Sequence, residues 1–248
     1  MRKSIILLFS AFAVAGLMTS CNKTNSTGGN NQNNGNNQEE TVTEEELITI
    51  DGAFDDWKAL KEGSYSITEL PDDEFQYTCL LKMMAVADRT NVYLYFEYQE
   101  EEEQTASPMT IVIDADDDPD TGFTDYHWSS AGWDYAIESS AGFIGSSYKK
   151  MNDFKLLKPM EGYDGQARSW DPKNYTDGTA KGVKNRGVKE NDIYTFEINI
   201  PRTLIKAEKK GITIRVATYV ENQEWHETGI LPIEDGISAS EMMEVYLP

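Results

Sequence analysis

Apolar residues recur at every second position in several short runs of the chain, and this alternation predicts β-strands. The clearest run is residues 92–98, where the apolar residues from Val92 onward share one face of an extended backbone. The apolar run 80–87 precedes it across a turn at residues 88–91, so the pair predicts a hairpin. A second hairpin is predicted for residues 183–189 and 193–200. Other strands are expected to end near residue 52 and to span residues 109–114, 133–138, 142–146, 148–157, 212–220 and 243–247.

Helical signals in the chain are short. Residues 54–57 predict one helical turn capped by an aspartate, and Pro201 opens a second turn. Residues 160–179 have no sustained period and many turn residues, which predicts a long loop. Many short strands without the spacing of strand–helix–strand units predict an all-β fold. We expect an antiparallel β-sandwich with only short helical turns.

The first residues have the pattern of a bacterial secretory signal. Positive Arg2 and Lys3 precede an apolar run at residues 5–18, and small residues then lead to Cys21. Residues 1–20 are therefore expected to be a lipoprotein signal peptide, and Cys21 the lipidated residue of an outer-membrane lipoprotein in the cell envelope. A transmembrane anchor is the alternative, but the apolar run is shorter than the roughly 20 residues of a span. The sequence leaves open whether the protein faces the surface or the periplasm.

The segment that follows has few residues that a core can bury. Residues 21–46 are rich in Asn, Gln, Gly, Ser, Thr and Glu, which predicts a flexible polar linker after the lipidated cysteine. Residues 47–248 are expected to form one domain. If Cys21 is acylated, only Cys79 remains, and a single thiol cannot form a disulfide within the chain. Its place at the start of an apolar run predicts a small buried residue.

The chain is strongly acidic, with a formal net charge of -21. Such a field repels nucleic acid and anionic lipid surfaces, so neither is an expected partner. The membrane is expected to be contacted only through the lipid on Cys21. Neutral ligands and divalent cations remain as favoured binding partners.

The densest group of carboxylates is an acidic turn. The apolar run 111–113 leads directly into five aspartates within seven residues, and a Thr-Gly pair follows. Carboxylate and carbonyl oxygens suit calcium, so a bound calcium ion is one interpretation. A solvated turn of mutually repelling charges is the other, and in both cases we expect a structural rather than a catalytic role. The candidate calcium ligands are Asp114, Asp116, Asp118 and Asp120.

Aromatic residues in turn-like segments are candidate ligand platforms. Flat rings stack on sugar faces while nearby polar groups bind hydroxyls. The alternative for each ring is that it covers the edge of the core. Trp57 and Trp133 are expected to pack inward, because one lies in an apolar-spaced unit and the other opens a predicted strand. The candidate platforms are Trp128, Trp170, Tyr175 and Trp225.

Catalytic motifs are absent from the sequence. It contains no Gly-x-Ser-x-Gly, His-Glu-x-x-His, phosphate loop or Cys-x-x-Cys. Pairs of carboxylates that could act as in a glycosidase occur by chance in any acid-rich chain. Haem ligation by His127 or His226 has no recognisable pairing. The sequence therefore predicts that the protein is not an enzyme.

Four short segments follow one another in an order that resembles a known family. They are Ile50-Asp51-Gly52 with Asp55-Asp56-Trp57, Val92-Tyr93-Leu94-Tyr95-Phe96, the strand and acidic turn at residues 111–123, and Ile198-Asn199-Ile200-Pro201 with Leu204. This order is similar to that of family 9 carbohydrate-binding modules and of the wider DOMON-like group. The resemblance covers residues 48–248 and implies a jelly-roll-like sandwich that is non-catalytic and binds sugars.

The chain departs from that family at the sugar-binding positions. The family's Trp before the acidic turn corresponds to Gln104 and Thr105, and its sugar-binding Arg falls near Ala136. Trp225 is only a loose positional match for a second Trp of the family. The resemblance therefore implies the fold more directly than the mode of sugar binding.

The sequence predicts a non-catalytic, lipid-anchored module of the cell envelope that binds a glycan. The alternative is a structural or adhesive surface lipoprotein that contacts other proteins in an envelope assembly. Calcium is the only cofactor that the sequence suggests.

Overall fold

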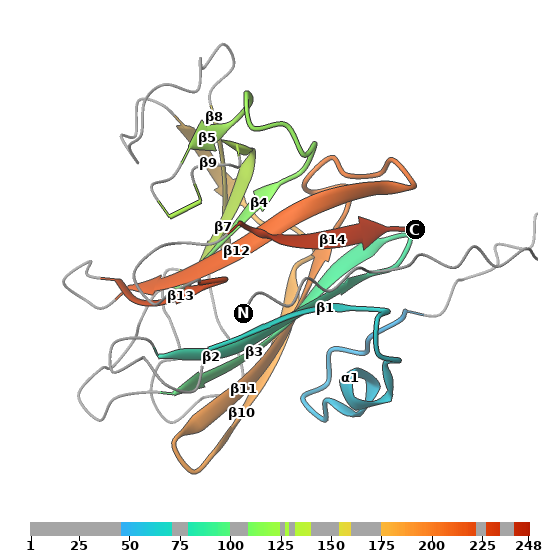
Figure 1. Cartoon of the computed structure of the whole chain (residues 1–248), viewed down its shortest axis with the longest axis vertical. Helices are drawn as coiled ribbons and strands as arrows, with labels where there is room; N and C mark the ends of the chain where they lie inside the picture. Colours follow the sequence, from blue (N-terminus) through green and yellow to red (C-terminus); the bar gives the residue numbers. More distant parts are fainter. Residues whose placement is uncertain are drawn as a thin grey trace, which may run out of the picture. The chain divides into compact units, whose positions relative to one another are not determined.

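The computed structural model describes residues 46–70, 79–99, 109–124, 127–128, 132–139, 154–159, 175–221, 227–233 and 241–248. These residues fall within one unit, Glu44–Pro248. They form two main antiparallel β-sheets that pack as a sandwich (Figure 1). The all-β sandwich predicted from the sequence is confirmed.

The first sheet has five strands, and the second has seven. The first has the order β1-β2-β3-β11-β10, with β1 Ser66–Glu69, β2 Leu80–Ala87, β3 Asn91–Gln99, β11 Ile193–Pro201 and β10 Lys184–Glu190. The second has the order β13-β12-β4-β7-β8-β9, with β13 Glu227–Leu231, β12 Ile212–Glu221, β4 Met109–Asp114, β7 Tyr135–Ser139, β8 Phe154–Pro159 and β9 Tyr175–Thr179, and β14 Met243–Leu247 pairs with β12. A separate two-stranded sheet joins β5 Phe123–Thr124 to β6 Gly132–Trp133.

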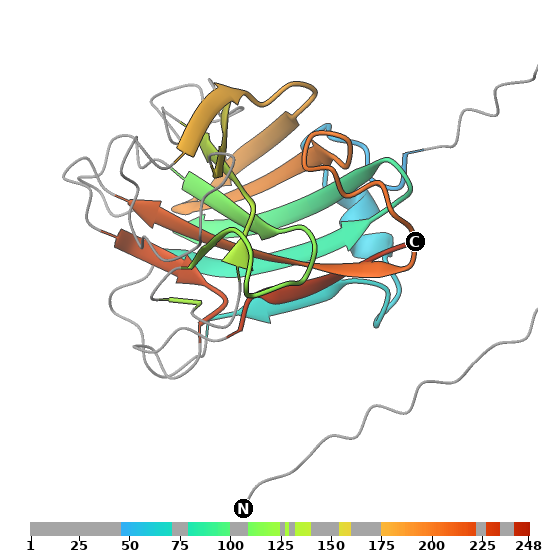
Figure 2. The same cartoon turned by 90° about the horizontal axis from the view of Figure 1, so that it is seen from above.

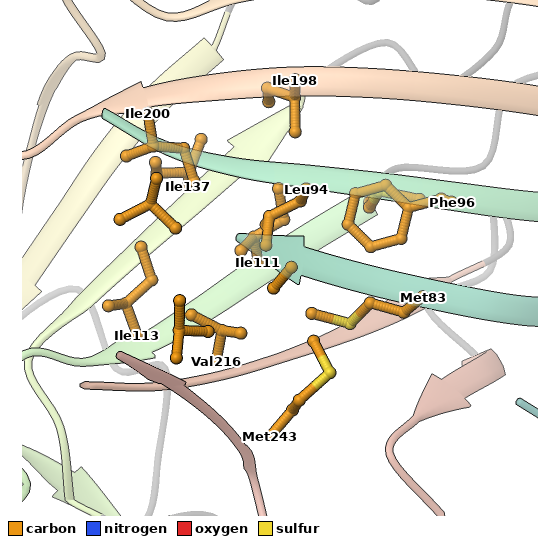
Figure 3. Close-up of a cluster of buried hydrophobic side chains, with 14 of the residues drawn as sticks. Met83, Leu94, Phe96, Ile111, Ile113, Ile137, Ile198, Ile200, Val216 and Met243 are labelled. Atoms are coloured by element: carbon orange, nitrogen blue, oxygen red, sulfur yellow. The ribbon is translucent and has the colours of Figure 1, made fainter. Parts of the chain in front are cut away.

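The main core lies between the inner faces of the two sheets (Figure 3). Leu94 and Phe96 of β3 meet Ile111 of β4 and Val216 of β12 there, and Ile198 of β11 lies beside them. Each of these side chains is at most 1% exposed. The alternation seen in the sequence therefore marks the positions that face the opposite sheet.

One edge of β12 is divided between two partners. Residues Ile212 to Val216 pair with β14, and residues Thr218 to Glu221 pair with β13. β14 also lies beside β1 and β2 of the first sheet (Figures 1 and 2). The two sheets therefore come together along this edge.

Most predicted strands are present. The hairpins β2–β3 and β10–β11 have the expected places, and β4, β12 and β14 match the predicted ranges closely. The strand predicted to end near residue 52 is wrong, because residues 46–54 form no strand. β7 pairs with β8, whereas residues 142–146, its predicted partner, lie outside the described residues. β9 lies in a predicted loop, and the short strands β1 and β13 were not predicted.

The helix α1, Asp55–Ala59, is the single helical turn expected near Trp57. The predicted aspartate cap is wrong: Phe54 is at the N-cap with a left-handed φ of 59°, and no side chain caps the helix. Asp56 instead accepts the backbone N–H of Thr49 at 2.8 Å. In the described part of the chain, no helix has the length and apolar character needed to cross a membrane.

The segment before β1 covers the outer face of the five-stranded sheet. Trp57 is 4% exposed and packs on Met84, Val86 and Tyr93 of that face, as expected for a core residue. Its Nε1 donates to the carboxylate of Glu197 on β11 at 3.0 Å. The same carboxylate, which has no exposed surface, accepts the backbone N–H groups of the Asp51-Gly52 turn at 2.8 and 2.6 Å. Glu197 thus holds the segment on the sheet.

Replacing Glu197 with alanine should lower the free energy of unfolding by about 2–4 kcal/mol, because three N–H donors lose their acceptor. Urea unfolding followed by tryptophan fluorescence measures this loss. Glu190→Ala, which removes an exposed carboxylate from the neighbouring strand β10, is the matched control and should change stability little. Equal stability of the two variants would contradict the role of Glu197.

Candidate functional site

The outer face of the seven-stranded sheet carries two groups of ionisable side chains with an aromatic cluster between them. Thr110, Val112 and Asp114 of β4 point to this face, yet all six residues of β4 are buried. The cross-strand register gives the order of the rows: Asp114 lies opposite Arg215, Val112 opposite Ala217, and Thr110 opposite Tyr219. The outer face is therefore covered, rather than open to solvent.

The aromatic cluster forms this cover. The rings of Phe123 and Trp133 lie 4.6 Å apart between centroids, on the β5–β6 pair. Trp128 joins them, has no exposed surface, and donates from Nε1 to the backbone oxygen of Pro232 at 3.3 Å. Beneath these rings lie the small and apolar residues of the sheet, which are Val112, Ala136, Leu157, Ala217 and Tyr219.

The prediction that Trp128 is an exposed sugar platform is wrong. Its neighbours in the sequence are polar, but the segment after the acidic turn folds back over the sheet, and that apolar face needs a large side chain to cover it. The expectation that Trp133 packs inward is correct, since it is 3% exposed. The polar residues next to Trp128 in the sequence therefore did not indicate whether its ring is exposed.

At one end of this face, three carboxylates lie together. Oxygen atoms of Asp114, Asp116 and Asp134 are within 4.8 Å of one another. Asp114 is buried, Asp134 is partly buried, and Asp116 is exposed, so the group opens to solvent on one side. These residues can hold a metal ion.

The pairing of β4 with β7 creates this arrangement. Ile113 pairs with Tyr135, which places Asp114 and Asp134 at the same end of the ladder, and the N–H of Asp134 donates to the oxygen of Ile113 at 2.8 Å. The Asp134 carboxylate accepts the N–H of Ala115 at 2.9 Å. The base of the acidic turn is thus fixed by both strands.

Two glycines allow the turn to close on itself. A Cβ at Gly132 would lie 1.9 Å from the oxygen of Thr121, and one at Gly122 would lie 2.4 Å from the oxygen of Trp133. Gly122 also has a positive φ of 67°. A side chain at either position would push the two halves of the turn apart. The glycine of the Thr-Gly pair noted in the sequence is therefore required by close backbone contact.

The other two predicted ligands lie outside the group of three. Asp118 is exposed and its carboxylate accepts the N–H of Asp120 at 3.0 Å, so it stabilises the turn locally. Asp120 is exposed as well. Asp117, which was not a predicted ligand, forms an ion pair with Arg215 of β12 at 2.5 Å. The structure therefore brings together two of the four predicted aspartates and adds Asp134.

Burial raises the pKa of both inner carboxyls. The pKa of Asp114 rises to about 6, chiefly through loss of hydration, although the N–H of Asp117 opposes the shift. The pKa of Asp134 is raised by the same main cause, also to about 6. A cation would stabilise the ionised form of both groups. Because the group offers only oxygen ligands, it fits a hard cation better than a soft one.

The opposite end of the face carries a second ionisable group. Glu221 of β12 lies directly opposite Glu227 of β13, and like charges in such a pair repel. Burial raises the pKa of Glu221 to about 7, with further contributions from Glu227 and Glu138. Nε2 of the buried His127 lies 2.7 Å from the carboxylate of Glu227. Glu221 and Glu227 had no signal in the sequence, and His127 was considered there only for haem ligation, because their proximity depends on the β12–β13 register and on the contact of His127 with β13.

Several predicted residues lie outside the described part of the chain. They are Cys21, Trp170 and Trp225, and they remain predictions. For Tyr175 the structure describes only the backbone, which belongs to β9 and pairs with Pro159. Ala136, at the position of the family's sugar-binding Arg, has no exposed surface and lies under the aromatic cluster. That part of the family's binding arrangement is therefore not reproduced.

Replacing Glu221 with glutamine should change the dependence of stability on pH. The pKa of Glu221 is about 7 in the folded protein, against 4.5 for a free glutamate. The contribution of Glu221 to the stability of the folded protein is therefore highest below pH 4.5, where Glu221 is protonated in both states, and part of it is lost as the pH rises from 4.5 through 7. Melting points of wild type and Glu221→Gln are measured at pH 4.5 and 8. The free energy of unfolding of the variant should rise relative to wild type at pH 8, by about 1 kcal/mol for a partly buried group. A difference that is the same at both pH values, as expected for the exposed Glu190→Gln control, would contradict this.

Among known proteins, the chain shows similarity only to solved structures. No protein-family model matches the chain, and no curated protein matches it. The chain is similar to a family 9 carbohydrate-binding module from Caldicellulosiruptor kristjanssonii in complex with cellotriose, with 14% identity, a TM-score of 0.40, and coverage of 81% of this chain and 89% of that one. A structure from the same organism and family in complex with glucose gives 14% identity, a TM-score of 0.42, and coverage of 81% and 91%. These structures come from the family that the sequence motifs resemble.

Proposed function

We propose that this protein is a non-catalytic glycan-binding module, held at the cell envelope by a lipid on Cys21. The observation that carries the proposal is the way in which the sequence motifs of the carbohydrate-binding family meet in the fold. Two of the four motifs are paired strands of the five-stranded sheet, a third packs on the outer face of that sheet, and the fourth is the acidic turn of the other sheet. Because three of these motifs contact one another in the fold, their order along the chain supports an architecture shared with that family rather than a chance series of short matches.

The contacts between the motifs are direct. The Asp51-Gly52 turn and Trp57 bind Glu197, which immediately precedes the Ile198 to Pro201 motif on β11. The Val92 to Phe96 motif on β3 pairs with that same stretch of β11. Changing one motif would therefore disturb the others.

The charge and the linker suit this role. A net charge of -21 disfavours anionic ligands and leaves neutral glycans as the favoured class. A flexible linker over residues 21–46 has a root-mean-square reach of about 25–30 Å, which holds a module clear of lipid headgroups. The localisation proposed is the outer membrane, with either face possible.

A glycan array tests the proposal. Purified protein should bind at least one neutral oligosaccharide of a panel that includes cello-, xylo-, manno- and galacto-oligosaccharides, with glucose and cellotriose as small probes. Trp170→Ala and Trp225→Ala should each weaken binding if these rings are platforms, by about tenfold for the loss of a stacked ring. No binding to any glycan, together with a protein that captures a stable envelope partner, would favour the structural or adhesive alternative.

We also propose that the three carboxylates of Asp114, Asp116 and Asp134 hold calcium. Calcium takes six to eight oxygen ligands and tolerates irregular geometry, so backbone oxygens and water can complete the site. The ion would offset the repulsion among the aspartates of the turn. It would also fix the base of the segment that carries Phe123, Trp128 and Trp133 onto the sheet.

Thermal unfolding in EDTA and in calcium tests this second part. Calcium at about 10 mM, a hundredfold above a dissociation constant of about 0.1 mM such as extracellular modules have, should raise the melting point by about 5–10 °C. Asp116→Asn should reduce the rise, whereas Asp120→Asn, an exposed change in the same turn, should leave most of it. An unchanged midpoint in the wild-type protein would rule out a calcium site here.

A further inference from the structure

A groove of about 360 Å³ lies where the two sheets meet, away from the covered outer face of the seven-stranded sheet. Its walls come from the residues just before β1, from the end of β2, and from β14. Figures 1 and 2 show β14 beside β1 and β2 at this edge. The volume is at the small end of the roughly 300–1,000 Å³ range of small-molecule sites.

The lengths of the paired strands create the groove. The ladder between β1 and β2 begins with Ser66 opposite Ala85, so Val86 and Ala87 of β2 extend beyond it and contribute to the lining. On the far side, β14 is joined to β1 by a hydrogen bond from Oγ of Ser66 to the backbone oxygen of Glu244. The opening is therefore held between two fixed strands.

The lining combines aromatic rings with hydroxyl groups. Tyr246 of β14 is 63% exposed, the largest exposure among the large hydrophobic residues of the described chain, and Tyr65 is half-buried. Ser64 and Ser66 supply hydroxyls whose protons are already donated, to the backbone oxygens of Lys61 and Glu244. Each of these hydroxyl oxygens keeps acceptor capacity, which suits a ligand that presents O–H donors.

The groove is also free of charged side chains. None of its lining residues is Asp, Glu, Lys, Arg or His, in a chain whose net charge is -21. An anionic ligand would meet no cationic side chain there, and a cationic ligand would meet no acidic side chain. The oxygen of Pro248, which also lines the groove, already accepts a hydrogen bond from the guanidinium of Arg202 at 3.3 Å. A purely apolar ligand would leave the serine and tyrosine hydroxyls without hydrogen bonds. The chemistry that remains is neutral, with a flat apolar face and an edge of hydroxyls.

We propose that this groove binds a neutral pyranose unit at the end of a glycan chain, with the Tyr246 ring as its stacking surface. The proposal rests on the proposed glycan-binding function and gives it a site distinct from the predicted tryptophan platforms. The ring of the sugar lies against tyrosine, while its hydroxyls donate to Ser64 and Ser66. The limited volume favours a chain end over an extended internal stretch.

Isothermal titration of the purified full-length protein tests the site, with the tightest neutral oligosaccharide of the array panel and, separately, the free monosaccharide. Tyr246→Ala should weaken binding about tenfold, because the sugar loses the ring on which its apolar face stacks. Tyr246→Phe keeps the ring and should bind nearly as well as wild type. Ile193→Ala removes a different exposed apolar side chain and is the matched control.

A second measurement does not depend on a variant. In the wild-type protein, the ring resonances of Tyr246 and Tyr65 should shift when the sugar is added. Binding that survives both Tyr246→Ala and Tyr65→Ala, with no shift of these resonances, would overturn the groove and leave the glycan-binding function intact. Failure of every glycan of the panel to bind would overturn the function itself. Tighter binding of the monosaccharide than of the oligosaccharide would show that the groove takes a free sugar and not a chain end.

Discussion

The buried carboxylate of Glu197 is the constraint on which the outer layer of the first sheet depends. Burial raises the pKa of this group, and the N–H groups of Gly52, Trp57 and Asp51 oppose the shift by stabilising its charge. Because these donors come from two separate turns, the segment can satisfy the carboxylate in only one conformation. Gly52 has a φ of 85°, which a residue with a side chain rarely adopts. The Asp-Gly and Trp motif is thus explained by one acid far along the chain.

The end of β11 imposes a second constraint close to the first. Arg202 is 1% exposed, and its guanidinium donates to the backbone oxygens of Ala207, Lys209, Asp88 and Pro248. These oxygens belong to the β2–β3 turn, to the segment after β11 and to the last residue. A guanidinium is always charged, so burying it without these acceptors would be costly. β11 therefore organises the fold through Glu197 and through Arg202, which follows it.

Strands and hairpins that depend on local periodicity could be predicted from the sequence, whereas contacts that depend on pairing between distant segments could not. The β2–β3 and β10–β11 hairpins were predictable because their partners are adjacent in sequence and their apolar faces alternate. Asp134 was missed as a partner of Asp114, because the 19 residues that separate them give no indication of register. Trp128 was misjudged because its burial depends on a segment that folds back over the sheet. The resemblance of the motifs predicted the sandwich, but not the side chains on its faces.

The covered faces limit where a ligand can bind. In the described residues, Trp57 lies on the outer face of one sheet, and Trp128 and Trp133 lie on that of the other. Rings that pack on these faces are not available to stack on sugars, so the proposed glycan would have to contact a sheet edge or the loops. The two open sites along the described edges differ in chemistry, since the acidic turn concentrates negative charge and the groove beside Tyr246 has no charged side chain. The proposed calcium ion and the proposed sugar would therefore not compete for the same residues.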